Sequence, residues 1–543
     1  MGNLASGKRR FCICFAWASN LLILTCSLLF WRPALATAAA AEADPAVQSA
    51  SGLPVSASRG QTEPAPAQRG EGGDQSANRG PTDAAPDWVP VVAAAFLAMF
   101  LQAGFALVAT GLCRAKNAAH MVTMSLLSYA LAGLGFWVGG FRILCGHEGL
   151  FFGPPGNNAR LAALFLLQAV FAATVAAIPV GAMAERWRLK NFLLYGVWAG
   201  LLPYAIVGRW VWGGGWLASL GRNFGLGHGQ VDFAGSSVLH LCGGMIALAG
   251  IAVIGPRLGK YGPPGRARPI QGHNLVYVVL GTFILAFGWF GLNAGMSLAG
   301  EDGRIAVVAV NTFLASAAAT VAGCLVMYWI LGKPDPSLLC NSLLAGLVAI
   351  AAPCAFVSAA AAVAIGAVAG VLAVWAVFFF ENTARLDDPV GALSVHAVNG
   401  AWGVLSLGLF ANGSFGAGWN GIHRLLKAGV AQTITSDGTS ETAARLRDLL
   451  AAGWTDQGVT GAVGTWFGAP ANDGSQLAAQ CVGLLACVLF VGCFAWIWFR
   501  LSNLLVPMRV AREDELAGLD RAEVGVECYP DYHLTDKSSP RIF

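Results

Sequence analysis

Long apolar stretches separated by short polar gaps make up most of this chain after Trp88. A helix that crosses a bilayer core about 30 Å thick needs roughly 20 apolar residues. We count about eleven stretches near this length, which predicts an all-α polytopic membrane protein with eleven transmembrane helices. The predicted spans are 88–113, 118–141, 160–182, 190–211, 233–255, 273–297, 304–331, 338–354, 356–380, 389–411 and 476–503.

The composition supports a membrane protein and excludes several other classes. Only 11% of the 543 residues are charged and 56% are hydrophobic, whereas a soluble domain carries about a quarter charged residues. The net charge of +4 is modest, so no nucleic-acid partner is predicted. The cysteines are scattered through apolar segments without the spacing of a metal site or a disulfide framework, so we predict neither metal nor cofactor.

The N-terminal part differs from the rest. A basic start at 8–10 and an apolar run from Phe11 to about Trp31 predict a signal peptide or an N-terminal anchor at 1–36. Residues 37–86 are rich in Ala, Pro, Gly, Gln and Ser and contain few large apolar side chains. Such a segment cannot bury enough surface to offset its chain entropy, so a disordered external leader is predicted.

The basic residues predict the orientation in the membrane. With the N-terminus outside, the odd-numbered gaps between spans are cytoplasmic, and these gaps hold more Lys and Arg than the others. We therefore expect a multi-pass protein of the cell (plasma or inner) membrane, with a transmembrane domain at 87–503 and a cytoplasmic tail at 504–543. Within the domain, 412–474 is predicted to be a long external loop with short surface helices around 422–452.

A repeated motif divides the bundle into halves. Asp232 to His240 and Asp388 to His396 both follow the pattern D-x-x-G-x-x-x-x-H. The first copy opens the fifth span and the second opens the tenth, which predicts two five-span halves and a final helix. An odd number of spans per half inverts the second half, as in the inverted repeats of many transporters, which handle substrate near the midplane.

The spacing inside the motif predicts where the histidines lie. Each aspartate is expected to cap the start of its helix, and Asp388 is assigned only this structural role. The histidine follows eight residues later, a rise of about 12 Å. In a core about 30 Å thick, His240 and His396 then enter from opposite faces and lie at nearly the same depth. A polar ring in hydrocarbon is costly and marks a pathway, so both are predicted pore residues.

A series of ordered motifs extends from about Trp88 to Tyr529. These motifs are GFALVATGLCRAKN (104–117), GAMAER (181–186), VWGGGWLAS (211–219), DFAGSSVLH (232–240), GWFGLNAG (288–295), NT (311–312), GKP (332–334), DDPVGALSVHAVNGAWG (387–403), GAGWNG (416–421), GVTGAVGTWFG (458–468) and GLDRAEVGVECYP (518–530). In these motifs the chain resembles the ammonium transporter family (Amt/Mep/Rh), and its Amt branch most closely.

The resemblance implies a homotrimer with one narrow apolar pore in each subunit, and ammonium or ammonia as the substrate. His240 and His396 correspond to the family's twin histidines. Trp212 corresponds to the aromatic residue that recruits ammonium by cation–π attraction, and Asp232 to the buried carboxylate that supports recruitment. Phe171 corresponds to the outer of two phenylalanines that gate the pore.

Some positions depart from the family pattern. Leu292 stands where the family usually has the second gate phenylalanine. Met296 stands where it usually has a serine that helps to recruit the cation, so Ser297 is the candidate replacement. In the tail, Val524 and Val526 stand where His and Glu are common, which weakens the expectation of a PII-type signal protein as a partner at the cytoplasmic face.

The expected function is therefore ammonium transport, in which ammonium is recruited at an outer vestibule, deprotonated, and passed as ammonia along the histidines. A non-conducting ammonium sensor of the same fold is the main alternative, because the gate and recruitment positions are altered. A membrane enzyme is disfavoured, since neither a carboxylate nor a cysteine cluster accompanies the histidines. Trp212 and the tail motif argue against a gas channel of the Rh type.

Overall fold

The computed structural model describes residues 88–146, 151–154, 156, 158–262, 267–297, 304–414, 459–463 and 474–530. Outside these residues lie the predicted signal or anchor at 1–36, the predicted leader at 37–86, and the end of the tail from 531. Most of the predicted external loop at 412–474, including its short helices around 422–452, also lies outside them.

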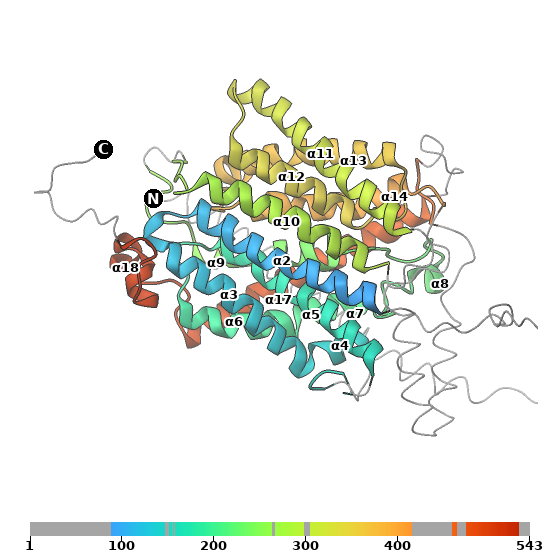
Figure 1. The fold of residues 1–543 in the computed structure, drawn as a ribbon, viewed down its shortest axis with the longest axis horizontal. Helices are drawn as coiled ribbons and strands as arrows, with labels where there is room; N and C mark the ends of the chain where they lie inside the picture. Colours follow the sequence, from blue (N-terminus) through green and yellow to red (C-terminus); the bar gives the residue numbers. More distant parts are fainter. Residues whose placement is uncertain are drawn as a thin grey trace, which may run out of the picture. The chain divides into compact units, whose positions relative to one another are not determined.

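The described part of the chain is all helical, as predicted (Figure 1). Within it, ten helical segments are long and apolar enough to cross a membrane. They are built from α2 (Val89–Leu112); η1 (Ala115–Asn117), α3 (Ala118–Gly135), η2 (Phe136–Gly140) and α4 (Phe141–Cys145); α5 (Ala159–Ala182); α6 (Leu189–Leu201) and α7 (Pro203–Val211); η4 (Ser236–Leu241) and α9 (Cys242–Ile254); α10 (Leu275–Gly295); α11 (Arg304–Leu331); α13 (Ala359–Phe378) and η5 (Phe379–Ala384); η6 (Leu393–Val398) and α14 (Asn399–Phe410); and α17 (Ser475–Leu505).

The eighth predicted span is shorter than expected. Helix α12 (Pro336–Ala351) has 16 residues, so the predicted number of eleven full-length spans is not confirmed. At the end of this helix, the carbonyl oxygens of Ala351 and Ala352 accept hydrogen bonds from the backbone N–H groups of Ala234 (2.9 Å) and Phe233 (3.2 Å), respectively. The free carbonyls at the end of α12 thus hold the segment that leads to His240.

Equivalent helix contacts recur in the two halves, in agreement with the predicted five-plus-five repeat. In the first half α2 packs on α5, α3 packs on α5 and α6, and α5 packs on α9. In the second half α10 packs on α12, α11 packs on α12 and α13, and α12 packs on α14. The halves meet where α2 packs on α10 and where η4 and η6 each contact the other half's helix, α14 and α9 respectively.

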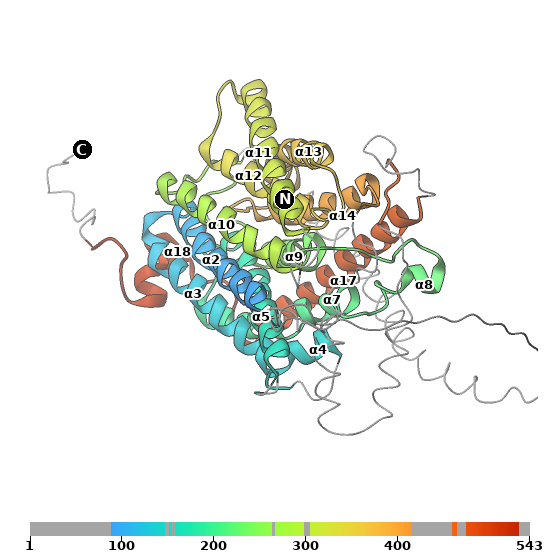
Figure 2. The same ribbon diagram turned by 45° about the vertical axis from the view of Figure 1, so that its right-hand side comes forward.

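Helix α17 stands outside the repeat and contacts both halves. It packs against α9 of the first half and α14 of the second, and Figure 2 shows it running obliquely past both. The final helix is therefore placed to fix the position of one half against the other.

Glycines allow the closest helix packing in the second half. A Cβ atom on Gly370 of α13 would lie 2.0 Å from the backbone oxygen of Ala319 on α11, and one on Gly366 would lie 2.1 Å from that of Ala315. These distances are shorter than any van der Waals contact. The two helices approach backbone to backbone, as small residues allow in membrane proteins.

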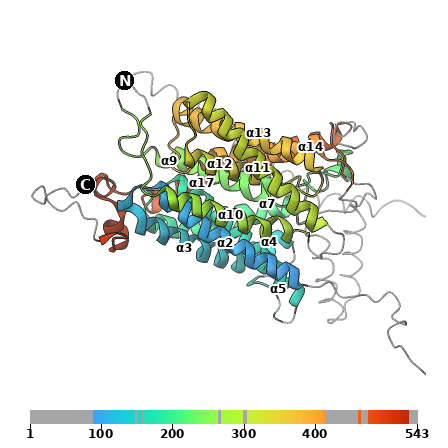
Figure 3. The same cartoon turned by 45° about the horizontal axis from the view of Figure 1, so that its top comes forward.

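The tail binds one end of the bundle, which we call the tail end; α18 (Arg512–Ala517) lies there and α8 (Leu220–Phe224) lies at the opposite end (Figures 1 and 3). The side chain of Arg509 pairs with Glu515 at 2.8 Å. The Glu515 carboxylate also accepts the backbone N–H of Leu258 at 2.7 Å, and Lys116 Nζ donates to the Glu515 backbone oxygen at 3.1 Å. These contacts attach the tail to the loops between the spans.

A buried ion-pair cluster joins the loops of both halves at the tail end. Arg257 Nε donates to Asp387 at 2.9 Å, and its Nη1 lies 3.2 Å from Glu185, a carboxylate that also pairs with Arg114. Burial alone would raise the pKa of the Asp387 carboxyl, but nearby Arg186 and the hydrogen-bonded Arg257 outweigh it and hold that pKa well below its ordinary value.

Replacing Gly370 by alanine is expected to destabilise the protein by about 1–3 kcal/mol, because the added methyl group collides with the α11 backbone. Gly133→Ala is the matched control, since a Cβ atom there meets nothing within 4 Å. Its stability should be unchanged or raised by up to about 1 kcal/mol. Unfolding in detergent checks both variants, and equal stability of the two would contradict the close packing of α11 and α13.

Removing the Asp387 charge is expected to destabilise the protein by about 3 kcal/mol near neutral pH, because Asp387→Asn leaves buried Arg257 without its closest carboxylate. The folded-state pKa of Asp387 lies below the unfolded value of about 3.9. The ionised Asp387 carboxylate therefore makes its full contribution to the free energy of unfolding above that pKa. This contribution is lost as the pH falls toward the folded-state pKa. Unfolding measured from about pH 7 to about pH 3 should show a smaller loss of stability in the variant than in the wild type. Parallel curves would refute the role of this ion pair.

Candidate functional site

The first copy of the repeated motif is organised by its aspartate. Asp232 Oδ1 accepts the backbone N–H groups of Gly235 (2.8 Å) and Ser236 (3.0 Å). Its Oδ2 accepts those of Ser237 (2.7 Å) and Val238 (3.0 Å), and the Ser237 hydroxyl at 2.5 Å. The buried carboxylate thus satisfies the free N–H groups at the start of η4, as a capping residue does.

The second copy repeats this arrangement. Asp388 accepts the backbone N–H groups of Gly391 at 3.1 Å and Leu393 at 2.7 Å, at the start of η6. The glycine of each motif has a positive φ, +103° at Gly235 and +76° at Gly391, a conformation that other residues rarely adopt. These turns explain the D-x-x-G part of the pattern, and each leads into a π-helical turn that carries the histidine.

The structure brings the two histidines into direct contact. Nδ1 of His240 lies 3.2 Å from Nδ1 of His396, and the ring centroids are 5.3 Å apart at an interplanar angle of 23°. The side chains are 0% and 4% exposed. One Nδ1 must donate and the other accept when both rings are neutral.

Two aromatic residues that the sequence did not single out complete the surroundings of the pair. Trp289 of α10 stacks on His240 with centroids 4.8 Å apart, and Phe105 of α2 lies 5.9 Å from His396. Trp289 lies in the motif GWFGLNAG, one turn before Leu292. Trp289 therefore lies on the same face of α10 as Leu292, and this spacing could have identified it from the sequence. The Nε1 of Trp289 and the Nε2 of His240 are buried and have no hydrogen-bond partner within the described residues.

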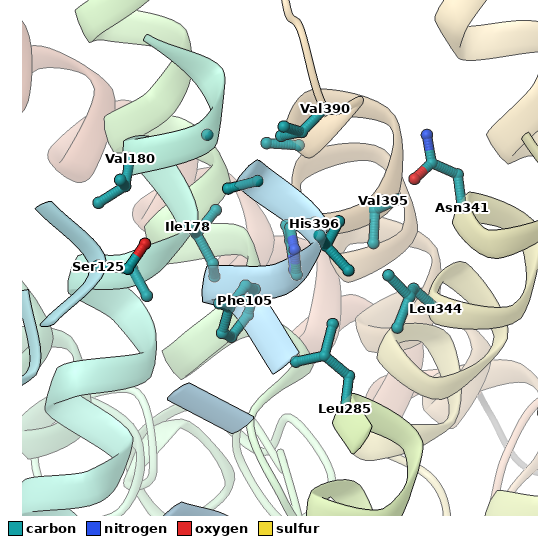
Figure 4. Close-up of a pocket in the computed structure, with 15 residues that line it drawn as sticks. Phe105, Ser125, Ile178, Val180, Leu285, Asn341, Leu344, Val390, Val395 and His396 are labelled. Atoms are coloured by element: carbon teal, nitrogen blue, oxygen red, sulfur yellow. The ribbon is translucent and has the colours of Figure 1, made fainter. Parts of the chain in front are cut away.

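A cavity lies beside His396 on the side of the tail end. Its volume is about 30 Å³, enough for at least one water-sized molecule. Figure 4 shows Phe105, Ile178, Leu285, Leu344 and Val395 around His396, with Ser125 and Asn341 as polar members of the wall. The pair therefore borders a small, mostly apolar chamber of the dimensions of ammonia or water.

The predicted recruitment and gate residues lie on the side of the pair away from the tail end. The ring of Trp212, at the end of α7, lies 6.1 Å from that of Phe171 on α5. Trp212 Nε1 donates to the backbone oxygen of Asp232 at 2.6 Å. All three residues are fully buried. The Asp232 carboxylate makes its hydrogen bonds within its own turn, so Asp232 meets Trp212 through the backbone.

The two departures at the gate and recruitment positions lie together at the end of α10, whereas Val524 and Val526 lie in the tail. Leu292 and Met296 are buried at 0% and 1% exposure. The Ser297 hydroxyl is buried and has no partner in the described part of the chain. Leucine at 292 supplies no second aromatic ring, so Phe171 is the aromatic member of the predicted gate.

Gln168, which the sequence reasoning missed, occupies the same region. Its Nε2 lies 3.9 Å from the sulfur of Met296, and its Oε1 accepts the Tyr204 hydroxyl at 2.5 Å. It lies one turn before Phe171, and a carboxamide inside an apolar span was the signal that could have identified it.

Comparison with known proteins places the chain in a family. The family model described as the Ammonium Transporter Family matches residues 89–529. The chain is 37% identical over 470 residues to ammonium transporter Amt2 of Archaeoglobus fulgidus, covering 84% of this chain and 90% of the relative. It is 30% identical over 455 residues to an ammonium transporter of Bacillus subtilis, covering 80% and 96%.

Solved structures give the same fold. A protein described as a sensor Amt protein superposes with a TM-score of 0.65 at 30% identity, covering 80% of this chain and 98% of the other. The crystal structure of Candida albicans Mep2 superposes with a TM-score of 0.63 at 24% identity, covering 82% and 90%; at this identity the match concerns the fold alone. Proteins of this family are transporters rather than enzymes. From the matched residues and the helical architecture, this chain is a multi-pass membrane protein of the ammonium transporter family.

Proposed function

We propose that this chain conducts ammonium across the cell membrane by passing it as ammonia between the two histidines. The Trp212 side of the bundle faces outward in this proposal, and the tail end faces the cytoplasm, as the distribution of basic residues indicates. The family resemblance adds a homotrimer with one such pathway in each subunit.

Ammonium is first held near Trp212. The face of an indole ring attracts a cation, and the hydrogen bond from Trp212 Nε1 to the Asp232 backbone fixes how the ring is turned. The nearby Gln168 carboxamide adds a polar group where Met296 replaces the family's serine.

The cation then loses a proton before it passes Phe171. Beyond this ring the pathway is lined by apolar groups such as Leu292, Leu285 and Val395. An unpaired charge costs several kcal/mol or more in such surroundings, whereas neutral ammonia does not carry this cost. Selectivity follows from this difference between the charged and neutral forms.

The histidine pair then offers ammonia both kinds of hydrogen-bonding group. Because one Nδ1 donates to the other, the donor ring has an accepting Nε2 and its partner has an Nε2–H donor in the neutral state. The observation that carries the proposal is the contact of the two buried rings, with His240 stacked on Trp289 and His396 next to a small apolar chamber.

Alanine at either histidine, His240→Ala or His396→Ala, is expected to abolish selective ammonium flux or change its selectivity, because the polar lining of the narrow pathway is lost. The measurement is a transient current on a solid-supported membrane after an ammonium pulse, combined with an internal pH dye. Selective flux at the wild-type level in both variants would exclude the proposed role.

Restoring the family's hydroxyl by Met296→Ser is expected to lower the apparent KM for ammonium about threefold to tenfold, since a new hydrogen bond to a cation contributes about 1 kcal/mol. Met296→Ala removes the thioether without adding a hydroxyl and serves as the control. A KM that falls equally in both variants, or in neither, contradicts a recruitment role for position 296.

The second candidate function is an ammonium sensor that binds without conducting. The similar solved structure described as a sensor Amt protein and the altered residues Leu292 and Met296 favour it. In the same liposome measurement, a sensor would show neither current nor pH change in the wild type while still binding ammonium.

A further inference from the structure

One face of the final helix supports the segment that leads into the first histidine. Gln476, Gln480, Gly483 and Cys487 of α17 are three or four residues apart and therefore lie on one face. All four contact residues 227–237, the segment that contains Asp232. None of the four belongs to the repeated halves.

Gln480 holds the residue directly before Asp232. Its Oε1 accepts the backbone N–H of Val231 at 2.8 Å, and its Nε2 donates to the backbone oxygen of Val231 at 2.7 Å. The side-chain amide thus pairs with both backbone groups of one residue, which fixes its position and its rotation. Gln480 is completely buried, so water does not replace these bonds at little cost if they are removed.

Gln476 also bonds to the backbone of this segment, at residues further from Asp232. Its Oε1 accepts the backbone N–H of His228 at 2.9 Å, and its Nε2 donates to the Gly229 oxygen at 2.9 Å. The Nε2 also lies 3.2 Å from Gln480 Oε1. The two glutamines form one connected hydrogen-bonded unit.

A third glutamine extends this support to the aspartate itself. Gln230 Nε2 donates to the Ser237 hydroxyl at 3.0 Å, and that hydroxyl donates to Asp232 at 2.5 Å. The Gln230 side chain occupies the space above Gly483, where a Cβ atom would lie 2.1 Å from its Cδ and Oε1. A side chain at 483 would displace the Gln230 carboxamide from this position.

Gln480 also reaches the second half of the bundle. Its Nε2 donates to the backbone oxygen of Val404 on α14 at 3.0 Å. Helix α14 follows η6, which carries His396. A single buried carboxamide therefore joins the segment before His240 to the helix after His396.

We propose that Gln480 is a positioning residue for ammonium recruitment and for the register of the two histidine-bearing segments. The inference rests on the proposed function. Trp212 is anchored on the Asp232 backbone oxygen, one residue after Val231. Release of Val231 would allow this anchor and the capped turn at Asp232 to shift, which weakens binding of the cation before it weakens passage through the pore.

The test compares Gln480→Met, which keeps the length of the side chain and removes its hydrogen bonds, with Ser502→Ala as the matched control. Ser502 is equally buried on the same helix, but its hydroxyl bonds only to Phe499 in the preceding turn. We expect Gln480→Met to raise the KM for ammonium about tenfold, as the loss of a buried hydrogen-bonded pair would. The maximal flux per folded protein should change much less.

Hydrogen exchange measured by mass spectrometry in detergent supplies a readout that does not depend on transport. The backbone N–H of Val231 should exchange faster in Gln480→Met and at the wild-type rate in Ser502→Ala, because only the first variant removes its acceptor. Gln480→Glu keeps an acceptor for this N–H and loses the donors, so it should restore the protection of Val231 in part.

The outcomes separate the two proposals. Unchanged KM and unchanged exchange at residues 227–237 in a folded Gln480→Met would overturn the positioning role and leave the transport proposal intact. Faster exchange with an unchanged KM would show that Gln480 only supports the local structure, and this result would also overturn the positioning role. Absence of flux in the wild type, with the exchange pattern as expected, would contradict the transport proposal instead.

Discussion

The structure depends on placing two imidazole rings inside an apolar helical bundle. A buried polar ring is costly unless it is hydrogen-bonded, and each histidine partly meets this requirement through the other, at 3.2 Å. The rings meet only if both motifs reach the same depth. This requirement explains why each motif begins with a capping aspartate, turns at a glycine with positive φ and enters a π-helical turn. The shortened α12 is part of the same arrangement, since its last carbonyls hold the first motif in place.

Polar groups outside the pair work mainly as supports. The Asp232 carboxylate is used by the turn that it caps, and its link to Trp212 runs through the backbone. The glutamines of α17 hold the preceding residues from outside the repeat. The proposed site is therefore built on helices and capped turns, and the hydrogen-bonded residues around it hold those turns in place.

The tail end of the bundle is held together by charged side chains. There, charged residues of the loops and the tail pair with one another, and Arg257 joins the loops of both halves through Glu185 and Asp387. The tail is attached to this end through Arg509, which donates to the backbone oxygen of Ile254, and through Glu515, which accepts the backbone N–H of Leu258. The bundle is thus fixed by hydrogen-bonded amides toward the Trp212 side and by ion pairs at the tail end.

The all-helical membrane fold follows from the sequence alone, because a long apolar run in a bilayer core can satisfy its backbone hydrogen bonds within itself only as a helix. The repeat and the approximate meeting of His240 and His396 follow from it as well, because helical rise converts spacing into depth. The other features of the site depend on contacts between segments that are far apart in the sequence. The stacking of Trp289 on His240, the contact of Gln168 with Met296 and the pairing of Gln480 with Val231 all join distant segments. Periodicity within one segment contains no information about which other segment it will face. The contact at the end of α12 is a further example, since its last carbonyls accept hydrogen bonds from the backbone of the turn that leads into another helix.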